Sequence, residues 1–338
     1  MRATYEAWTV LELGAKGALA EARFTLVGRT CVRGRRGAIW NEWVLQFEDG
    51  ALAFLAETSG TFTLYREGSL LPPFEGTVVG RALDVGYVVV ARGEGVRVAS
   101  WGQVEGAPTT YAYAELSSRF GVEATVDFGS DPPRVFVGRK VTLAELGLSM
   151  RSAARSHFVL APEVSRPSGV ETWLDVGDEG ELEGARLRVV GMLSRSMDVA
   201  DRAAVPERAT WEEYLLFEPH TGMRWLVVAD GEWSVVEPIA AGRVAEPDAT
   251  AAVFDGVAYE VVSEGSARID WATGELPWEV TIGEESNIRI HARSSWTLTK
   301  EWTAEELSWS RSTRVNPEVI AKAFAKRVLP RPRSRSFS

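Results

Sequence analysis

The chain contains one sequence pattern twice. Residues 11–28 read LELGAKGALAEARFTLVG, and residues 174–191 read LDVGDEGELEGARLRVVG. Residues 17–28 are identical to residues 180–191 at six of twelve positions. The copies lie about 163 residues apart, which is far longer than the period of a solenoid repeat and close to the size of an ordinary domain. The sequence therefore predicts a duplicated domain.

Two further blocks repeat in the same order. Residues 40–45 (WNEWVL) align with residues 211–216 (WEEYLL), and residues 141–146 (VTLAEL) align with residues 302–307 (WTAEEL). The last block contains Thr-x-x-Glu in both copies, which is the spacing of a capping box, where each side chain satisfies a backbone donor of the other residue. We therefore expect a short helical turn to close each repeat.

Alternation of apolar and polar residues dominates the chain. In residues 287–291 (NIRIH) the isoleucines face one side and the polar residues the other, as in a half-buried strand. Residues 211–217, 224–228 and 233–236 are separated by Gly-containing turns and predict a three-stranded meander. We expect an all-β, mainly antiparallel protein with two tandem, structurally similar β-barrel or β-sandwich domains, short helical turns and a C-terminal helix.

The repeat and the composition set the predicted domain boundaries. We place the first β-domain, the more divergent copy, at residues 1–150 and the clearer second copy at residues 173–312. Residues 151–172 are rich in Ser, Arg and Pro and are interpreted as a linker. Residues 313–338 are expected to form a short amphipathic helix and a basic tail.

The C-terminal helix has clear start and stop signals. Asn316 is a good N-cap, Pro317 suits the first helical position, and Pro330 is expected to end the helix. The predicted apolar stripe consists of Ile320, Phe324 and Val328. The basic residues are Lys322, Lys326, Arg327, Arg331, Arg333 and Arg335. Two interpretations remain: a helix docked on the second domain with a solubilising tail, or an anchor for anionic lipid or an acidic partner.

Charge and targeting features narrow the function classes. The net charge of −10 argues against a general nucleic-acid binder, because phosphate binding requires clustered Lys and Arg. The single cysteine, Cys31, rules out an internal disulfide framework. We see neither an apolar stretch long enough to span a membrane nor a secretion signal. We expect a cytoplasmic protein, with peripheral contact with the inner membrane as the alternative that the tail leaves open.

Residues for catalysis or metal binding form no recognisable constellation. The three histidines are far apart in sequence, and we expect no metal site, no cofactor and no catalytic residues. Adjacent strand residues point to opposite faces, so Glu212 and Glu213 cannot form one acid–base pair. Glu42 and Glu213 match between the copies, and we favour a structural role for them over catalysis, such as pairing with a matched arginine.

Aromatic residues are the outstanding feature of the composition. The chain has thirteen tryptophans, and nine of them lie from Trp173 onward. We favour a structural role for them in half-buried sheets over a row of exposed rings that stacks on a ligand. The candidate binding or structural residues are Trp40, Glu42, Trp211, Glu213, Tyr214, Trp225, Trp233 and Trp278.

The second copy resembles the bacterial domain of unknown function 4178. The resemblance rests on residues 211–216 (WEEYLL), 224–226 (RWL), 230–233 (DGEW) and 274–278 (GELPW), and it covers most of residues 172–310. The first copy is similar but divergent: it keeps residues 40–43 (WNEW) and has Phe54 and Phe62 in place of the tryptophan pair. The resemblance implies no established activity. It implies an accessory role in a bacterial system that handles membrane or envelope stress.

Three functions are compatible with these observations. The leading hypothesis is a non-enzymatic accessory or scaffold protein that binds an unidentified partner protein or the membrane surface. The alternative is a module that binds a small ligand, a polyamine or other cation or a sugar, through Trp-rich and acidic surfaces. An enzyme that uses only carboxylates is the least favoured.

Overall fold

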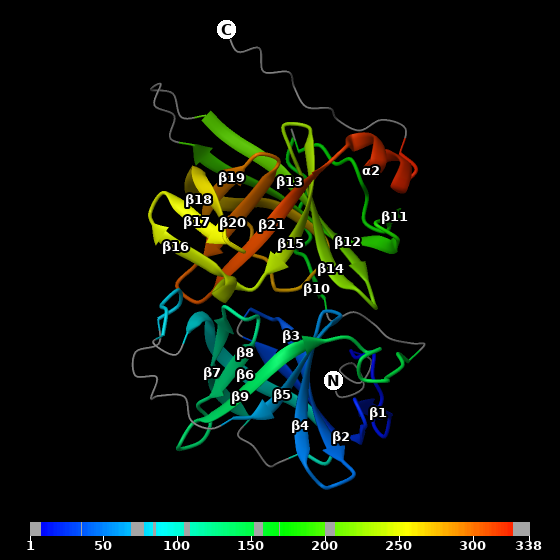
Figure 1. Ribbon diagram of the computed structural model, residues 1–338. Helices are drawn as coiled ribbons and strands as arrows, with labels where there is room; N and C mark the ends of the chain where they lie inside the picture. The colour runs from blue at the N-terminus through cyan, green and yellow to red at the C-terminus, as the bar shows by residue number, and fades with distance from the viewer. Residues whose placement is uncertain are drawn as a thin grey trace. The chain divides into compact units, whose positions relative to one another are not determined.

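The computed structural model describes residues 8–34, 36–68, 78–83, 86–104, 109–151, 158–168, 170–199 and 207–326. Contacts divide the chain into two compact units, with the main boundary between Val159 and Leu160. Each unit contains a closed antiparallel sheet of eight strands, which confirms the predicted all-β class (Figure 1).

The first unit forms a nine-stranded sheet in the described part of the chain. Its order is β1-β2-β3-β4-β5-β9-β8-β7-β6, and an additional β2–β6 pairing closes β2 to β9 into a barrel. The strands are β1 (Lys16–Leu19), β2 (Ala22–Gly34), β3 (Ile39–Phe47), β4 (Leu52–Thr58), β5 (Thr61–Glu67), β6 (Tyr87–Gly102), β7 (Thr110–Ser118), β8 (Glu123–Asp127) and β9 (Arg134–Val141).

The second unit forms a twelve-stranded sheet among its described residues. Its main path is β11-β12-β13-β14-β15-β21-β20-β19-β18-β17-β16, with β12–β18 as the closing pair. The strands are β10 (Val159–Leu160), β11 (Glu179–Leu182), β12 (Ala185–Val199), β13 (Glu207–Glu218), β14 (Gly222–Ala229), β15 (Glu232–Ile239), β16 (Val244–Asp248), β17 (Ala251–Phe254), β18 (Val257–Leu276), β19 (Glu285–Arg293), β20 (Trp296–Trp302) and β21 (Leu307–Val315). The predicted meander corresponds to β13, β14 and β15, and is confirmed.

The two barrels share a strand order and a local irregularity. In each closing strand, β2 and β12, the pairing register shifts immediately before a glycine, Gly28 or Gly191. A Cβ on Gly28 would lie 1.9 Å from the carbonyl oxygen of Gln103, and one on Gly191 would lie 2.2 Å from that of Glu275. The repeated glycine is therefore needed where the barrel closes, because only a residue without a side chain permits this backbone approach.

Each unit has a large apolar core on one face of β2 to β5 or of β12 to β15. In the first unit Trp43, Leu45 and Leu55 pack under Leu11 and Leu146. In the second unit the core residues include Tyr214, Leu216 and Trp233, with Leu174 and Ile320 packed on them. The matched Leu11 and Leu174 thus cover equivalent cores, which explains why the sequence repeat begins there.

The C-terminal helix α2 (Pro317–Ala323) begins as predicted. The Asn316 side chain accepts a hydrogen bond from the Glu318 backbone N–H at 2.9 Å. Ile320 and Phe324 are buried in the second core. The prediction that Pro330 ends the helix is wrong: Ala325 has φ +51°, and the Lys326 N–H bonds to the Ala321 carbonyl, so a left-handed cap ends it earlier.

The expected capping boxes have different outcomes. In the first unit the Thr142 N–H donates to Glu145 at 2.7 Å and the Glu145 N–H donates to Thr142 at 3.2 Å, as predicted. The expected helical turn in the second copy is wrong. Residues 302–307 align with residues 141–146 in sequence, but residues 303–305 form a bend between β20 and β21 and do not follow the last strand. The counterpart of the 142–146 turn is α2, since each follows the last barrel strand of its unit in chain order, β9 or β21, and buries an aliphatic residue, Leu146 or Ile320.

No helix in the described residues has the length and apolar character needed to cross a membrane.

Candidate functional site

The matched residues Trp211 and Glu213 belong to a polar cluster on one face of the second barrel. In an antiparallel pair, residues directly opposite each other point to the same face. The register therefore extends this face across five strands. Its members are Leu193, Arg195, Met197, Trp211, Glu213, Ala267, Ile269, Ser286, Ile288 and Glu301.

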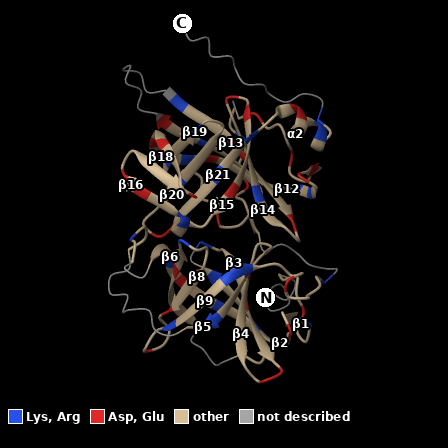
Figure 2. Cartoon of the chain, viewed as in Figure 1, with Lys and Arg blue, Asp and Glu red and all other residues tan. Residues whose placement is uncertain are grey.

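This face is the concave side of the barrel. The Arg195 guanidinium on β12 reaches Glu301 on β20, although β18 and β19 lie between these strands in the sheet. Residues on the opposite face behave as an outer surface: Arg208 and Arg268, both exposed, pair there with Asp270. Figure 2 shows that blue and red segments, which mark basic and acidic residues, are spread over the strands of this barrel. Two side chains on strands separated by two others can touch only if the sheet curves so that their face lies on the inside.

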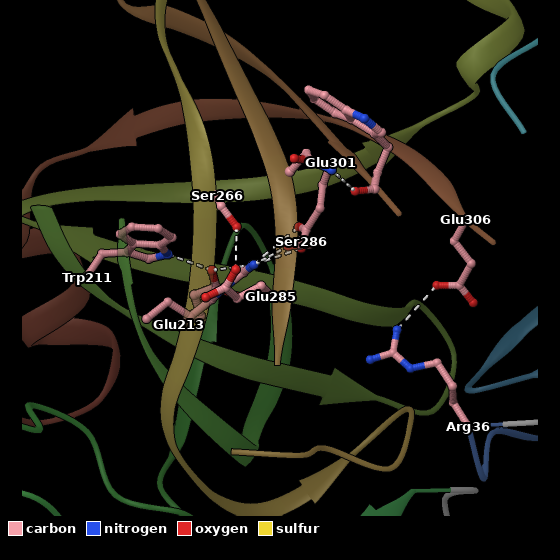
Figure 3. A network of polar contacts seen from close by, with 11 residues as sticks. Arg36, Trp211, Glu213, Ser266, Glu285, Ser286, Glu301 and Glu306 are labelled. Carbon is pink, nitrogen blue, oxygen red and sulfur yellow. Dashed lines mark hydrogen bonds and ion pairs between the residues drawn. The ribbon is translucent and has the colours of Figure 1, made fainter. Parts of the chain in front are cut away.

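Arg195 is the centre of the second-barrel cluster. Its Nη2 lies 2.8 Å from Glu301 Oε1 and 2.7 Å from Ser286 Oγ, and its Nη1 lies 3.4 Å from Glu213 Oε1. The Trp211 indole N–H donates to the same Glu213 oxygen at 2.6 Å. Figure 3 shows Trp211, Glu213, Ser286 and Glu301 turned toward one another around this point.

Burial sets the electrostatics of this cluster. Desolvation raises the pKa of Glu213, against the lowering effect of Arg195. Desolvation also opposes the charge of Arg195, but Glu213 and Glu301 outweigh it and raise the pKa of the guanidinium. The Arg195 side chain is only 7% exposed, whereas that of Glu301 is 35% exposed. The cluster is therefore a charged network that solvent reaches from one side.

The first barrel has its own cluster on the same face. Glu42 accepts the Tyr111 hydroxyl at 2.5 Å and the Trp40 indole N–H at 3.1 Å. Desolvation and the Glu42 charge raise the pKa of Tyr111, so its phenol stays protonated and donates. Arg97 lies 3.6 Å from Asp127 and stacks over the Tyr111 ring at 4.3 Å.

The two clusters occupy equivalent positions. Tyr111 lies opposite Gly95, and in the second barrel Ser286 lies opposite Ala267. Two residues further along the same strands, Tyr113 lies opposite Asp127 and Ile288 lies opposite Glu301. The equivalent pairs are Trp40 and Trp211, Glu42 and Glu213, Tyr111 and Ser286, and Asp127 and Glu301.

The arginine changes strand between the barrels. Arg195 on β12 lies opposite Ile269 on β18, whereas the equivalent pair in the first barrel is Val32 on β2 and Arg97 on β6. Each cluster therefore contains one guanidinium, but it comes from β12 in the second barrel and from β6, the strand paired with β2, in the first. Pairing of Glu213 with an arginine matched between the copies, given above as one example of a structural role, is not observed. Glu213 pairs with Arg195, whose counterpart is Val32. Arg186, which matches Arg23, pairs with Glu179.

The first barrel differs in that one carboxylate of its cluster, Glu42, has no cationic partner among the described residues. Among the described residues no Lys or Arg lies within ion-pair distance of Glu42, whereas its counterpart Glu213 pairs with Arg195. Glu115 lies two positions along the same face of β7 from Tyr113; solvent reaches it, and it makes no polar contact with the residues that the structure describes. Although solvent reaches this carboxylate, the surrounding barrel wall partly desolvates it and raises the pKa of Glu115 to about 7, and the neighbouring Glu123 adds to this.

The aromatic candidates fall into two groups. Tyr214 and Trp233 are fully buried in the second core, where their rings stack at 5.9 Å. Trp225 and Trp278 are half-buried and lie 6.1 Å apart, while Trp40 and Trp211 belong to the concave clusters. The predicted set therefore divides between packing and the candidate site.

The basic C-terminal residues are only partly described. Lys322 is exposed on α2, but Lys326 pairs with Asp178 at 2.7 Å and Asp175 at 3.3 Å and is engaged within the second unit. Val328, Arg327, Arg331, Arg333 and Arg335 lie outside the described residues.

One family model matches part of the chain, within the second unit. Residues 175–317 match the family model described as domain of unknown function (DUF4178). No curated protein matches the chain. Among solved structures, a protein of unknown function from the DUF3598 family of Nostoc punctiforme is 9% identical, with 90% of this chain and 95% of that chain covered and a TM-score of 0.15.

Proposed function

We propose that this chain is a non-enzymatic accessory protein whose first barrel binds a small organic cation on its concave face. The observation that carries the proposal is the state of Glu42. It occupies the place of Glu213 but receives only the neutral donors Tyr111 and Trp40. Its charge has no cationic partner among the described residues, and a ligand cation would supply one.

The second barrel supports the choice of ligand. There the Arg195 guanidinium lies between Glu213 and Glu301 and 5.7 Å from the Trp211 ring centroid. The first barrel has Trp40 and Glu42 at the matching positions, with Val32 in place of the arginine. Carboxylates next to aromatic rings favour ammonium and guanidinium groups through ion pairing and cation–π attraction. Glu115 and the ring of Tyr113 extend this lining along β7.

The similarity of the two barrels supports a proposal about their relationship. We infer that the first barrel is a divergent copy of the domain that the family model matches in residues 175–317. The shared strand order, the matched glycines and the four equivalent cluster positions support this inference. The binding of a partner protein or an anionic membrane, in the cytoplasm, stays a prediction from the sequence.

Calorimetric titration with spermidine and with arginine methyl ester tests the proposed function. We expect saturable binding to the full chain that weakens as salt rises, because ion pairs at a partly open site are screened. Glu42→Gln keeps the shape of the side chain but removes its charge, and should weaken binding at least about tenfold, since a hydrogen-bonded charge pair contributes about 1.5–3 kcal/mol. The matched control is Glu94→Gln, an exposed residue on the outer face of β6. Equal affinities for the two variants, or no binding by the wild type, would contradict the proposal.

Binding should also depend on pH through Glu115. Its pKa is raised to about 7, so the carboxyl is mostly neutral at pH 6 and mostly ionised at pH 8. A cation binds the ionised form better, and we therefore expect spermidine affinity to rise between pH 6 and pH 8. Glu115→Gln should flatten this rise. An affinity profile that is the same in wild type and Glu115→Gln would remove Glu115 from the site.

A further inference from the structure

The β16–β17 hairpin folds back over the outer face of the second barrel. β17 pairs with β18, and β16 pairs with β17 at the end of the sheet. Glu246 on β16 nevertheless reaches two strands that are not its neighbours: Lys300 on β20 at 2.6 Å and Arg289 on β19 at 3.4 Å. These two ion pairs hold β16 across the face that carries Arg289 and Lys300.

A buried histidine lies on this face. His291 is opposite Leu298, two residues along each strand from the Arg289–Lys300 pair and therefore on the same side of the sheet. It is 0% exposed, and its ring lies 5.3 Å from that of Trp309. Neither ring nitrogen makes a hydrogen bond of good geometry among the described residues, although the Leu298 backbone lies close enough to favour a protonated ring. A buried polar ring without a partner is costly, and it becomes more so when the ring gains a proton.

The surrounding charges oppose protonation of His291 in the closed arrangement. Desolvation lowers the pKa of His291 and outweighs the opposite effects of Glu246 on β16 and of the Leu298 backbone on β20, while Arg289 on its own strand and Lys300 on β20 lower it further. On β18, Val261 is the uncharged residue opposite the ring, and Glu264 beside it is already paired with Arg289 at 2.8 Å. Trp309 on β21 is uncharged.

We propose that the β16–β17 hairpin closes over this face at neutral pH and opens on acidification, with His291 as the group that triggers the release. When the hairpin opens, water reaches the ring, which then takes up a proton near the ordinary histidine pKa of about 6.5. The closed form gains no such proton because its pKa is depressed. Closure is therefore complete above about pH 6.5 and is progressively lost as the pH falls below it.

Hydrogen exchange measured by mass spectrometry on the full chain tests this proposal. After correction for intrinsic exchange, protection of residues 244–254 should fall by up to about tenfold between pH 7.5 and pH 5.5, which is the change in the fraction of accessible histidine that binds a proton. Other barrel strands should keep their protection. Equal protection of this hairpin at the two pH values would overturn the proposal.

Three variants assign the effect. His291→Phe keeps a ring of similar size but cannot titrate, and should protect residues 244–254 equally at both pH values. His220→Gln, an exposed turn residue, should keep the wild-type response. Glu246→Gln removes the ion pairs and should lower protection at both pH values while a pH response remains, so that it tests the hairpin contact even if His291→Phe fails to fold. A pH response that persists in His291→Phe would contradict the role of His291.

Discussion

Replacing Arg195 with valine is expected to destabilise the second barrel by about 3–5 kcal/mol, which is the range for removal of one partner of a buried charge pair. The change leaves Glu213 and Glu301 facing each other without the cation that joins them. Chemical denaturation of the full chain, followed by the fluorescence of its tryptophans, measures this loss.

The first barrel suggests how to reverse this loss. Valine occupies the equivalent position, Val32, and the arginine stands on the adjacent strand as Arg97. The double variant Arg195→Val with Ile269→Arg copies that arrangement into the second barrel, so the new guanidinium can reach Glu301 as Arg97 reaches Asp127. We expect the double variant to recover at least half of the lost stability. A double variant less stable than Arg195→Val would mean that the two clusters are not equivalent.

Truncation of Trp233 to alanine is the second large effect, and should also cost about 3–5 kcal/mol. Trp233 is 1% exposed and stacks on Tyr214 in the core that α2 covers. The loss combines the transfer free energy of the indole with the cavity that remains. Its unfolding free energy is measured under the same conditions as that of Arg195→Val.

Trp225→Ala is the matched comparison for this variant. Trp225 lies on the neighbouring strand but is only half-buried and contacts Trp278. We expect a smaller loss of stability than for Trp233→Ala. If Trp225→Ala left the melting temperature unchanged, Trp225 would belong to a binding face and not to the core.

Local patterns in the sequence were sufficient to predict much of the fold. Alternation and Gly-containing turns predicted β13, β14 and β15. The turn residues Asp230 and Gly231 adopt positive φ, a conformation that Asp tolerates and that Gly adopts without steric cost. Asn316 and Pro317 predicted the start of α2 for the same reason. Its end was missed because Ala325, a residue with no strong preference for a left-handed cap, adopts one there.

The sequence identified only some residues of the candidate site. Trp-x-Glu at residues 40–42 and 211–213 places an indole and a carboxylate on one face of a strand, and this spacing was the available signal. The partners were missed: Arg195, Ser286 and Glu301 are distant in sequence, and barrel closure brings them together. Sequence matching between the copies could not identify the arginine, because Arg97 and Arg195 occupy different strands.

A crystal structure of the full chain soaked with spermidine is the most direct test of the central claim, that the concave face of the first barrel is a cation site. The expected result is an ammonium group within hydrogen-bonding distance of the Glu42 carboxylate and next to the Trp40 ring, with the Arg195 cluster of the second barrel unchanged. Spermidine bound only at outer-face carboxylates, with Glu42 still held by Tyr111 and Trp40 alone, would contradict the claim.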